Sequence, residues 1–141
     1  DNESQHAKQF LRFIGNVAPF EVCAALPAGM GDTLANLQFG FEGEHEENTI
    51  LYPNYAKTAR EEGFEDVAKC FEYVTTVEKH HEARYRALYQ NLLNNMVFNK
   101  LNVVNWICLK CGYIHTGENA PNECPLCHHP QAYYQMLCDN Y

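Results

Sequence analysis

The chain has 141 residues and a formal net charge of -8 at pH 7. This length fits one helical domain followed by a small module, and the negative charge argues against a nucleic-acid partner and against an anionic membrane surface. The apolar runs all fall short of the roughly 18 residues of a membrane-spanning helix, and the sequence starts without a secretory signal. We therefore expect a protein that binds neither nucleic acid nor membranes.

The chain opens with a predicted helix and a long connector. The helix covers residues 3–14 and ends at Gly15, because glycine often follows the last helical turn. Residues 16–31 hold two Pro and two Gly and show no period, so they form the connector. The chain does not begin with methionine, and we expect it to be a fragment or a processed form.

A second helix is predicted over residues 34–62, after a cap at Asp32 or Thr33. Pro53 lies inside it, and a proline within a helix bends or breaks the preceding turn, so we expect a kink there. Gly63 closes this helix.

The third helix is predicted over residues 65–94, directly after Gly63. So short a gap makes the second and third helices antiparallel neighbours. One apolar stripe follows the third helix at helical spacing. Its members are Val67, Cys70, Phe71, Val74, Val77, His81, Tyr85, Leu88 and Leu92.

Three motifs place two potential metal ligands three residues apart on a helix. They are Glu3 with His6, Glu44 with Glu47, and Glu78 with His81. Residues at this spacing share one helical face, and carboxylates buried there need a compensating positive group. Each motif alone is a weak signal, because acidic residues and histidines are common in this chain.

The register of the motifs strengthens the signal. Glu47 precedes Gly63 by 16 residues and Glu78 follows it by 15, so a fold-back at Gly63 brings both to about the same height. The connector reaches up to about 56 Å, against the roughly 28 Å that a parallel crossover of the first helix requires. Ferritin-like di-iron bundles use two Glu-x-x-His motifs and a Glu from each of two further helices, of which this sequence offers all but one helix. Carboxylates with imidazoles suit iron or manganese.

Other polar residues near the motifs have simpler interpretations. The acidic residues that we expect to be solvated surface charges are Glu46, Glu61, Glu62 and Glu82. His45 and His80 lie one position off the motif faces, so we expect them at the surface or behind a ligand. Tyr52 either donates a hydrogen bond to a ligand carboxylate or packs in the core.

The cysteines indicate a second metal site. The chain has seven, an odd number that fits a reducing compartment better than a disulfide framework. Four form two Cys-x-x-Cys pairs separated by 12 residues, namely Cys108, Cys111, Cys124 and Cys127. Such pairs make a tetrahedral site for zinc or a single iron. We therefore divide the chain into a helical domain at 1–95, a linker at 96–104 and a metal-knuckle module at 105–141.

Taken together, these motifs resemble the rubrerythrin family over essentially the whole chain. The matching segments are Glu3-x-x-His6-Ala7-Lys8, Leu26-Pro27-Ala28-Gly29, Ala35-Asn36-Leu37, Gly43-Glu44-His45-x-Glu47, Tyr52-Pro53, Ala59-Arg60-Glu61-Glu62-Gly63, Glu78-x-x-His81-Glu82 and the run from Trp106 to Tyr113. The resemblance implies a mainly α, ferritin-like bundle, of which three of the four helices are encoded here, followed by a small rubredoxin-like β domain.

The resemblance also implies a function. Rubrerythrins are cytoplasmic peroxidases that reduce hydrogen peroxide to water in oxidative-stress defence, with electrons from rubredoxin or an NAD(P)H-dependent reductase. An iron held by the four cysteines relays them to an oxo- and carboxylate-bridged di-iron site. By position, the carboxylate ligands are Glu3, Glu44, Glu47 and Glu78, with Glu3 and Glu78 as bridges. His81 is a nitrogen ligand, Glu47 and His6 exchange with redox state, and Tyr52 lies beside the site.

Two departures from the family pattern stand out. The family's first helix, which carries one more Glu ligand, has no counterpart here, so we expect a second copy or a separate N-terminal fragment to complete the bundle. A homodimer or larger homo-oligomer is the expected assembly. His128 stands where free rubredoxins have glycine. The alternative functions are a ferroxidase or iron-storage protein and a non-catalytic zinc ribbon on a helical scaffold.

Overall fold

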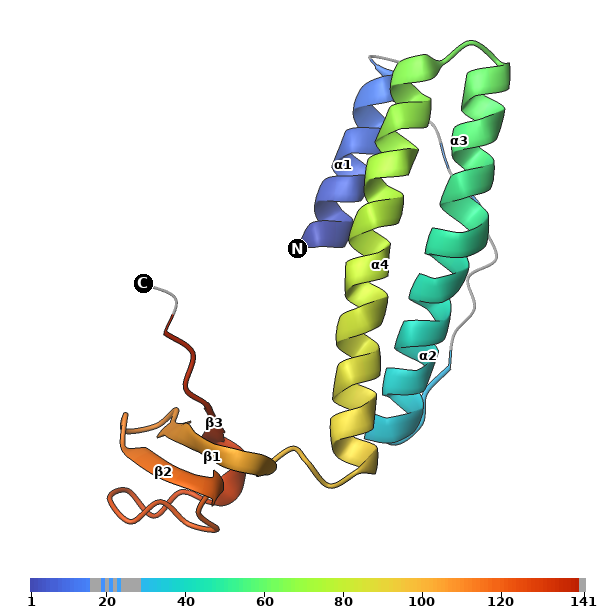
Figure 1. Ribbon diagram of the computed structural model, residues 1–141. Helices are drawn as coiled ribbons and strands as arrows, with labels where there is room; N and C mark the ends of the chain where they lie inside the picture. The colour runs from blue at the N-terminus through green and yellow to red at the C-terminus, as the bar shows by residue number, and fades with distance from the viewer. Residues whose placement is uncertain (16–18, 20, 22, 24–28, 140–141) are drawn as a thin grey trace. The chain divides into compact units, whose positions relative to one another are not determined.

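The computed structural model describes residues 1–15, 19, 21, 23 and 29–139 (Figure 1). It contains two compact units, Asp1–Arg86 and Ala87–Tyr141. Most of the predicted connector lies outside the described residues, and so does the predicted Leu26-Pro27-Ala28-Gly29 motif except for Gly29. In the described part of the chain, every helix is too short or too polar to span a membrane.

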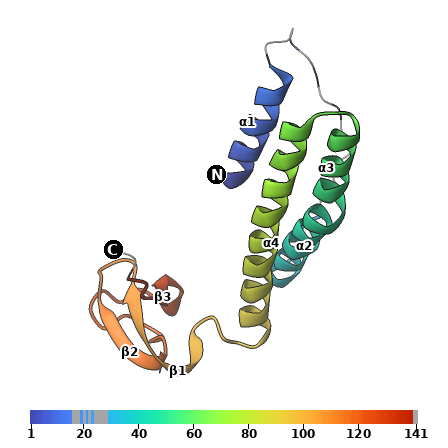
Figure 2. The ribbon, with the colours of Figure 1, turned by 45° about the horizontal axis from the view of Figure 1, so that its top comes forward.

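The first unit is helical. Its elements are α1 (Asn2–Ile14), α2 (Thr33–Glu46), a π-helical turn (Glu47–Leu51), α3 (Tyr52–Glu61) and most of α4 (Glu65–Leu93), whose last residues from Ala87 belong to the second unit. α2 and α3 follow one another along one side of α4, and α1 lies against α4 separately (Figures 1 and 2). α1 runs in the direction of α2 and α3 and opposite to α4, which is the predicted parallel crossover.

Local signals at the helix ends act as predicted. The carboxylate of Asp32 accepts a hydrogen bond of 2.8 Å from the backbone N–H of Ala35, which caps α2. Gly63 has a φ of +87°, and the N–H groups of Gly63 and Phe64 donate to carbonyls in the last turn of α3. This pattern is a Schellman motif, which requires the left-handed conformation that glycine adopts without strain.

Pro53 interrupts the long second helix in a different way from the expected kink. The turn before it, Glu47–Leu51, is π-helical, and the N–H of Tyr52 donates to the carbonyl of Glu47, five residues earlier. Proline has no N–H to give to the carbonyl four residues back, and its ring crowds that carbonyl. A wider turn relieves both problems, and π turns of this kind are often found at functional sites.

The apolar stripe predicted on α4 is partly or fully buried over its first half and exposed over most of its second half. Val74 is 5% exposed, whereas Tyr85, Leu88 and Leu92 are 38%, 51% and 37% exposed. The reason is the position of α1, whose Asn2 at its first turn lies opposite His81. α1 therefore does not extend along the later turns of α4 (Figure 1).

The second unit is a small antiparallel sheet with strand order β2-β1-β3. Its strands are β1 (Asn99–Cys108), β2 (Ile114–Asn119) and β3 (Tyr134–Met136), with a short 3-10 helix at Gln131–Tyr133. The core consists of Trp106, Cys108, Ala120, Cys124 and Tyr134, each at most 4% exposed. β1 takes in residues 99–104 of the predicted linker, since these residues are extended and pair in part with β2. The predicted fold class is confirmed.

Candidate metal centres

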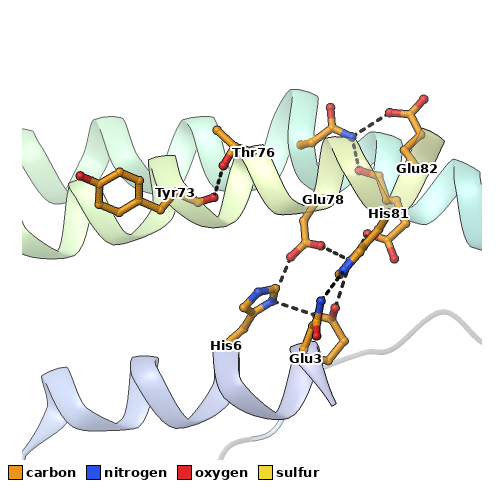
Figure 3. Close-up of polar contacts among 10 residues, drawn as sticks. Glu3, His6, Tyr73, Thr76, Glu78, His81 and Glu82 are labelled. Carbon is orange, nitrogen blue, oxygen red and sulfur yellow. Dashed lines mark hydrogen bonds and ion pairs between the residues drawn. The ribbon is translucent and has the colours of Figure 1, made fainter. Parts of the chain in front are cut away.

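The three helical motifs meet at one place. Glu3 from α1, Glu44 from α2, and Glu78 and His81 from α4 offer ligand atoms that all lie within 4.8 Å of one another. Figure 3 shows how Glu3, Glu78 and His81 point toward one another. The predicted register about Gly63 therefore holds, since His81 Nδ1 lies 3.6 Å from Glu44 Oε2. α1 joins in the opposite sense to α4, with Glu3 beside His81 and His6 beside Glu78.

Glu78 lies at the centre of this cluster. Its side chain is 0% exposed, and neither carboxylate oxygen has a hydrogen-bond donor of good geometry. His6 Nδ1 lies 3.0 Å from its Oε1, and His81 Nδ1 lies 2.7 Å from its Oε2. Burial, followed by the negative charges of Glu3 and Glu44, raises the pKa of Glu78 to about 8. A buried carboxylate with unpaired oxygens indicates a site for positive charge.

Two further carboxylates complete the cluster. Glu3 is 62% exposed, and its two oxygens lie 3.2 Å from His6 Nδ1 and 3.3 Å from His81 Nδ1. Glu44 is 16% exposed, and its buried Oε2 has no hydrogen-bond donor. Burial raises the pKa of Glu44, although the nearby His81 opposes this shift. Three carboxylates around imidazoles form a hard donor set, which suits iron or manganese.

The remaining predicted site residues lie around the cluster. His6, 14% exposed, contacts Glu78 but is not among the four converging ligands. Glu47 is half-buried, and its pKa is raised first by burial and then by Glu44 and Glu3. Tyr52 packs against the rings of Phe10 and Phe71, with centroids 6.1 and 5.9 Å away. Burial raises the pKa of Tyr52 well above its usual value, so its hydroxyl stays protonated.

The prediction that Glu82 is a solvated surface charge was wrong. Glu82 instead belongs to a polar network behind the site. Its side chain is only 15% exposed and accepts hydrogen bonds from Asn48, Arg86 and His45. Although burial opposes the shift, these bonds lower the pKa of Glu82 to about 2. Asn48, which was not predicted, is also part of this network and is 4% exposed. The pairing of His45 with Glu82 could have been predicted, because they lie 18 residues before and 19 residues after Gly63 and so reach the same height on the two helices.

The four predicted cysteine ligands come together in the second unit. The Sγ atoms of Cys108 and Cys127 are 3.7 Å apart, those of Cys111 and Cys124 are 3.6 Å apart, and all four lie within 4.8 Å of one another. A tetrahedral site with metal–sulfur bonds of about 2.3 Å has sulfur–sulfur edges of about 3.8 Å. The thiols are therefore already arranged to hold a single iron or zinc ion.

The turns that carry these cysteines repeat one geometry. Gly112 has a φ of +77° and donates its N–H to the carbonyl of Cys108 at 2.8 Å. His128 has a φ of +58° and donates its N–H to the carbonyl of Cys124 at 2.9 Å. The histidine thus adopts the left-handed conformation of the glycine at the equivalent position.

Comparison with known proteins identifies the family. The rubrerythrin family pattern matches residues 1–89, and the pattern of the rubrerythrin rubredoxin-like domain matches residues 106–135. The chain belongs to the rubrerythrin family. Among curated rubrerythrins it is 48% identical to rubrerythrin-1 of Clostridium acetobutylicum, with 100% of this chain and 74% of the relative covered. It is 42% identical to the rubrerythrin of Porphyromonas gingivalis, with 100% and 70% covered.

A solved structure is also similar. The mixed-valence state of nigerythrin matches with a TM-score of 0.54 and 26% identity, covering 94% of this chain. The chain spans 62% of that nigerythrin chain. The carboxylate and histidine cluster fits the di-iron site of a rubrerythrin, and the four cysteines fit its rubredoxin-like iron site. This rubrerythrin is thus a di-iron protein with a rubredoxin-like centre, in a family linked to oxidative stress.

Proposed function

We propose that this rubrerythrin is a non-haem di-iron peroxidase that reduces hydrogen peroxide to water. The observation that carries the proposal is the pairing of two centres in one chain, a carboxylate and imidazole cluster and a four-thiol site. The reaction consumes one peroxide, two electrons and two protons and yields two waters. Reduced rubredoxin or an NAD(P)H-dependent reductase supplies the electrons, which pass one at a time through the four-cysteine centre.

Four converging side chains would hold the irons in this proposal. Glu3 and Glu78 each direct their two oxygens at different histidines. Glu44 and His81 would complete the set, because their ligand atoms converge on the same place. When bound, the iron pair supplies two electrons at adjacent positions, so that peroxide is reduced without release of a radical. A four-thiolate centre, which has no open position, suits electron transfer alone.

His6 and Glu47 are the proposed exchange ligands. His6 lies within 3.0 Å of Glu78, whereas Glu47 remains half-buried at the edge of the cluster with a raised pKa. Either side chain would add one ligand to the iron pair, and an imidazole and a carboxylate would place different charges beside it. Tyr52 keeps its proton because burial raises its pKa, so its hydroxyl can donate a hydrogen bond to a carboxylate or an oxygen species beside the site.

Turnover with defined electron donors tests the proposal. The iron-loaded protein should catalyse oxidation of reduced rubredoxin by hydrogen peroxide, with two electrons consumed per peroxide, and metal analysis should give two irons at the helical site. A ferroxidase would instead consume oxygen with added Fe²⁺ and retain ferric iron without oxidising the donor. A colourless, zinc-only protein would overturn the proposed relay.

A further inference from the structure

The π-helical turn Glu47–Leu51 directly follows α2, in the segment that carries two of the carboxylate ligands. It contains more residues per turn than the α-helix around it, so the side chains after it point in different directions from those of an uninterrupted helix. Glu44 lies just before this turn and Glu47 begins it. The relative placement of these two carboxylates therefore depends on where the helix widens and on what holds it there.

Asn48 is the buried residue of this turn, 4% exposed. Its Nδ2 donates to the backbone carbonyl of Glu44 at 2.5 Å and to Oε2 of Glu82 at 2.8 Å. Both amide hydrogens are thus used. One bond reaches a ligand-bearing residue in α2, and the other crosses to α4 at the neighbour of ligand His81.

The acceptor on α4 is itself fixed. Glu82 accepts a hydrogen bond of 2.7 Å from Arg86 Nε and one of 3.1 Å from His45 Nδ1, in addition to the bond from Asn48. The guanidinium of Arg86 in turn lies 4.2 Å from the centre of the Phe41 ring. Charge-assisted bonds of this kind are the stronger ones in proteins, so Glu82 is a rigid anchor for the amide.

We infer that Asn48 is a positioning residue of the di-iron site, which locks the π turn against α4 through Glu44 and Glu82. The inference rests on the proposed roles of Glu44 and Glu47 as iron ligands. Residues behind metal ligands commonly change metal affinity by about 10–100-fold when they are replaced. Asn48 acts at one remove, because it holds the backbone from which two ligands project.

Thr49 provides a matched control in the same turn. Its hydroxyl donates to the carbonyl of His45 at 2.5 Å, which is also a side-chain bond to a carbonyl four residues earlier. Thr49 is exposed, and this bond stays within its own segment of the chain. A purely local effect on the π turn would therefore be shared by both residues, whereas a clamp between helices is specific to Asn48.

The experiment compares Asn48→Leu with Thr49→Val in the 141-residue chain, with the four-cysteine site already filled. Binding of Fe²⁺ and of Co²⁺ to the helical site is measured without oxygen, together with the visible spectrum of bound Co²⁺, which reports its coordination. Asn48→Leu should weaken metal binding by about 10–100-fold and alter the Co²⁺ spectrum. Thr49→Val should leave both unchanged.

A rescue pair covers the case in which Asn48→Leu does not fold. Asn48→Asp sets two carboxylates against each other, and adding Glu82→Gln restores a hydrogen bond between the helices with donor and acceptor exchanged. The double variant should bind metal more tightly than Asn48→Asp alone.

Two outcomes decide the inference. It would be overturned if Asn48→Leu lowered the melting temperature but left the metal affinity and the Co²⁺ spectrum as in the wild type. Loss of metal affinity in Asn48→Leu, in a protein whose wild type binds metal but turns over no peroxide, would support the clamp and reject the peroxidase.

Discussion

The two metal centres are built in opposite ways. The four cysteines lie between residues 108 and 127 on two turns that repeat one backbone geometry. The carboxylate and histidine ligands extend from residue 3 to residue 81 and come from three helices. Local turns thus fix the first site, whereas the packing register of separate helices fixes the second.

The consequences for robustness differ accordingly. Cys108 and Cys124 are 0% exposed and belong to the core of their unit, so the metal and the fold support each other there. In the helical unit, Glu3 is 62% exposed while Glu78 is fully buried in the same cluster. Loss of a ligand should therefore unfold the small unit but only empty the helical site.

The largest expected effect follows from Cys108→Ser. Metal binding in small four-ligand sites is linked to about 10–16 kcal/mol of folding free energy, and serine is a poor ligand in a buried position. The second unit should unfold, while the helical content measured by circular dichroism stays close to that of the wild type. Trp106, the only tryptophan and 1% exposed, reports this directly through a red shift of its fluorescence. Unchanged emission with retained iron would refute the proposed link between metal and fold.

Glu78→Ala should instead affect the helical site and leave the second unit folded. Removal of the central carboxylate should abolish iron binding at the helical site and peroxide turnover, while the colour of the four-cysteine iron and the Trp106 fluorescence remain. Glu72→Ala is the matched control, because Glu72 is on the same helix with a side chain 51% exposed. Retained peroxidase activity in Glu78→Ala would exclude the proposed site.

The same contrast explains what could be predicted from sequence. The Cys-x-x-Cys spacing is a local signal, and the register of Glu47 and Glu78 about Gly63 needs only helical geometry. Glu82 was predicted as a surface charge because its burial depends on Asn48 and His45 from another helix. The π turn depends on how the chain accommodates Pro53, for which helical periodicity gives no signal.

A smaller effect is expected from Gly112→Ala, within one knuckle. Nothing lies within 4 Å of an added Cβ, so the cost is the left-handed backbone at a φ of +77°. That conformation costs an ordinary residue about 1–2 kcal/mol. The midpoint of iron loss in guanidinium should fall, while the spectrum of the bound iron stays the same. A change in the spectrum without a change in the midpoint would mean that Gly112 acts on the sulfurs and not on the backbone.

The smallest expected effect has the opposite sign and comes from His128→Gly in the other knuckle. His128 bears the strain that Gly112 avoids, since its φ is +58°. Relief of about 1–2 kcal/mol is offset by the roughly 0.5–1 kcal/mol that glycine's greater freedom costs on folding. The variant should therefore be slightly more resistant to iron loss in guanidinium. Glu123→Ala is the control, because it removes the exposed contact of 2.8 Å to His128 Nδ1 and leaves the backbone at His128 unchanged. If His128→Gly destabilised the site and Glu123→Ala did so equally, this side-chain contact and not the backbone would distinguish the two knuckles.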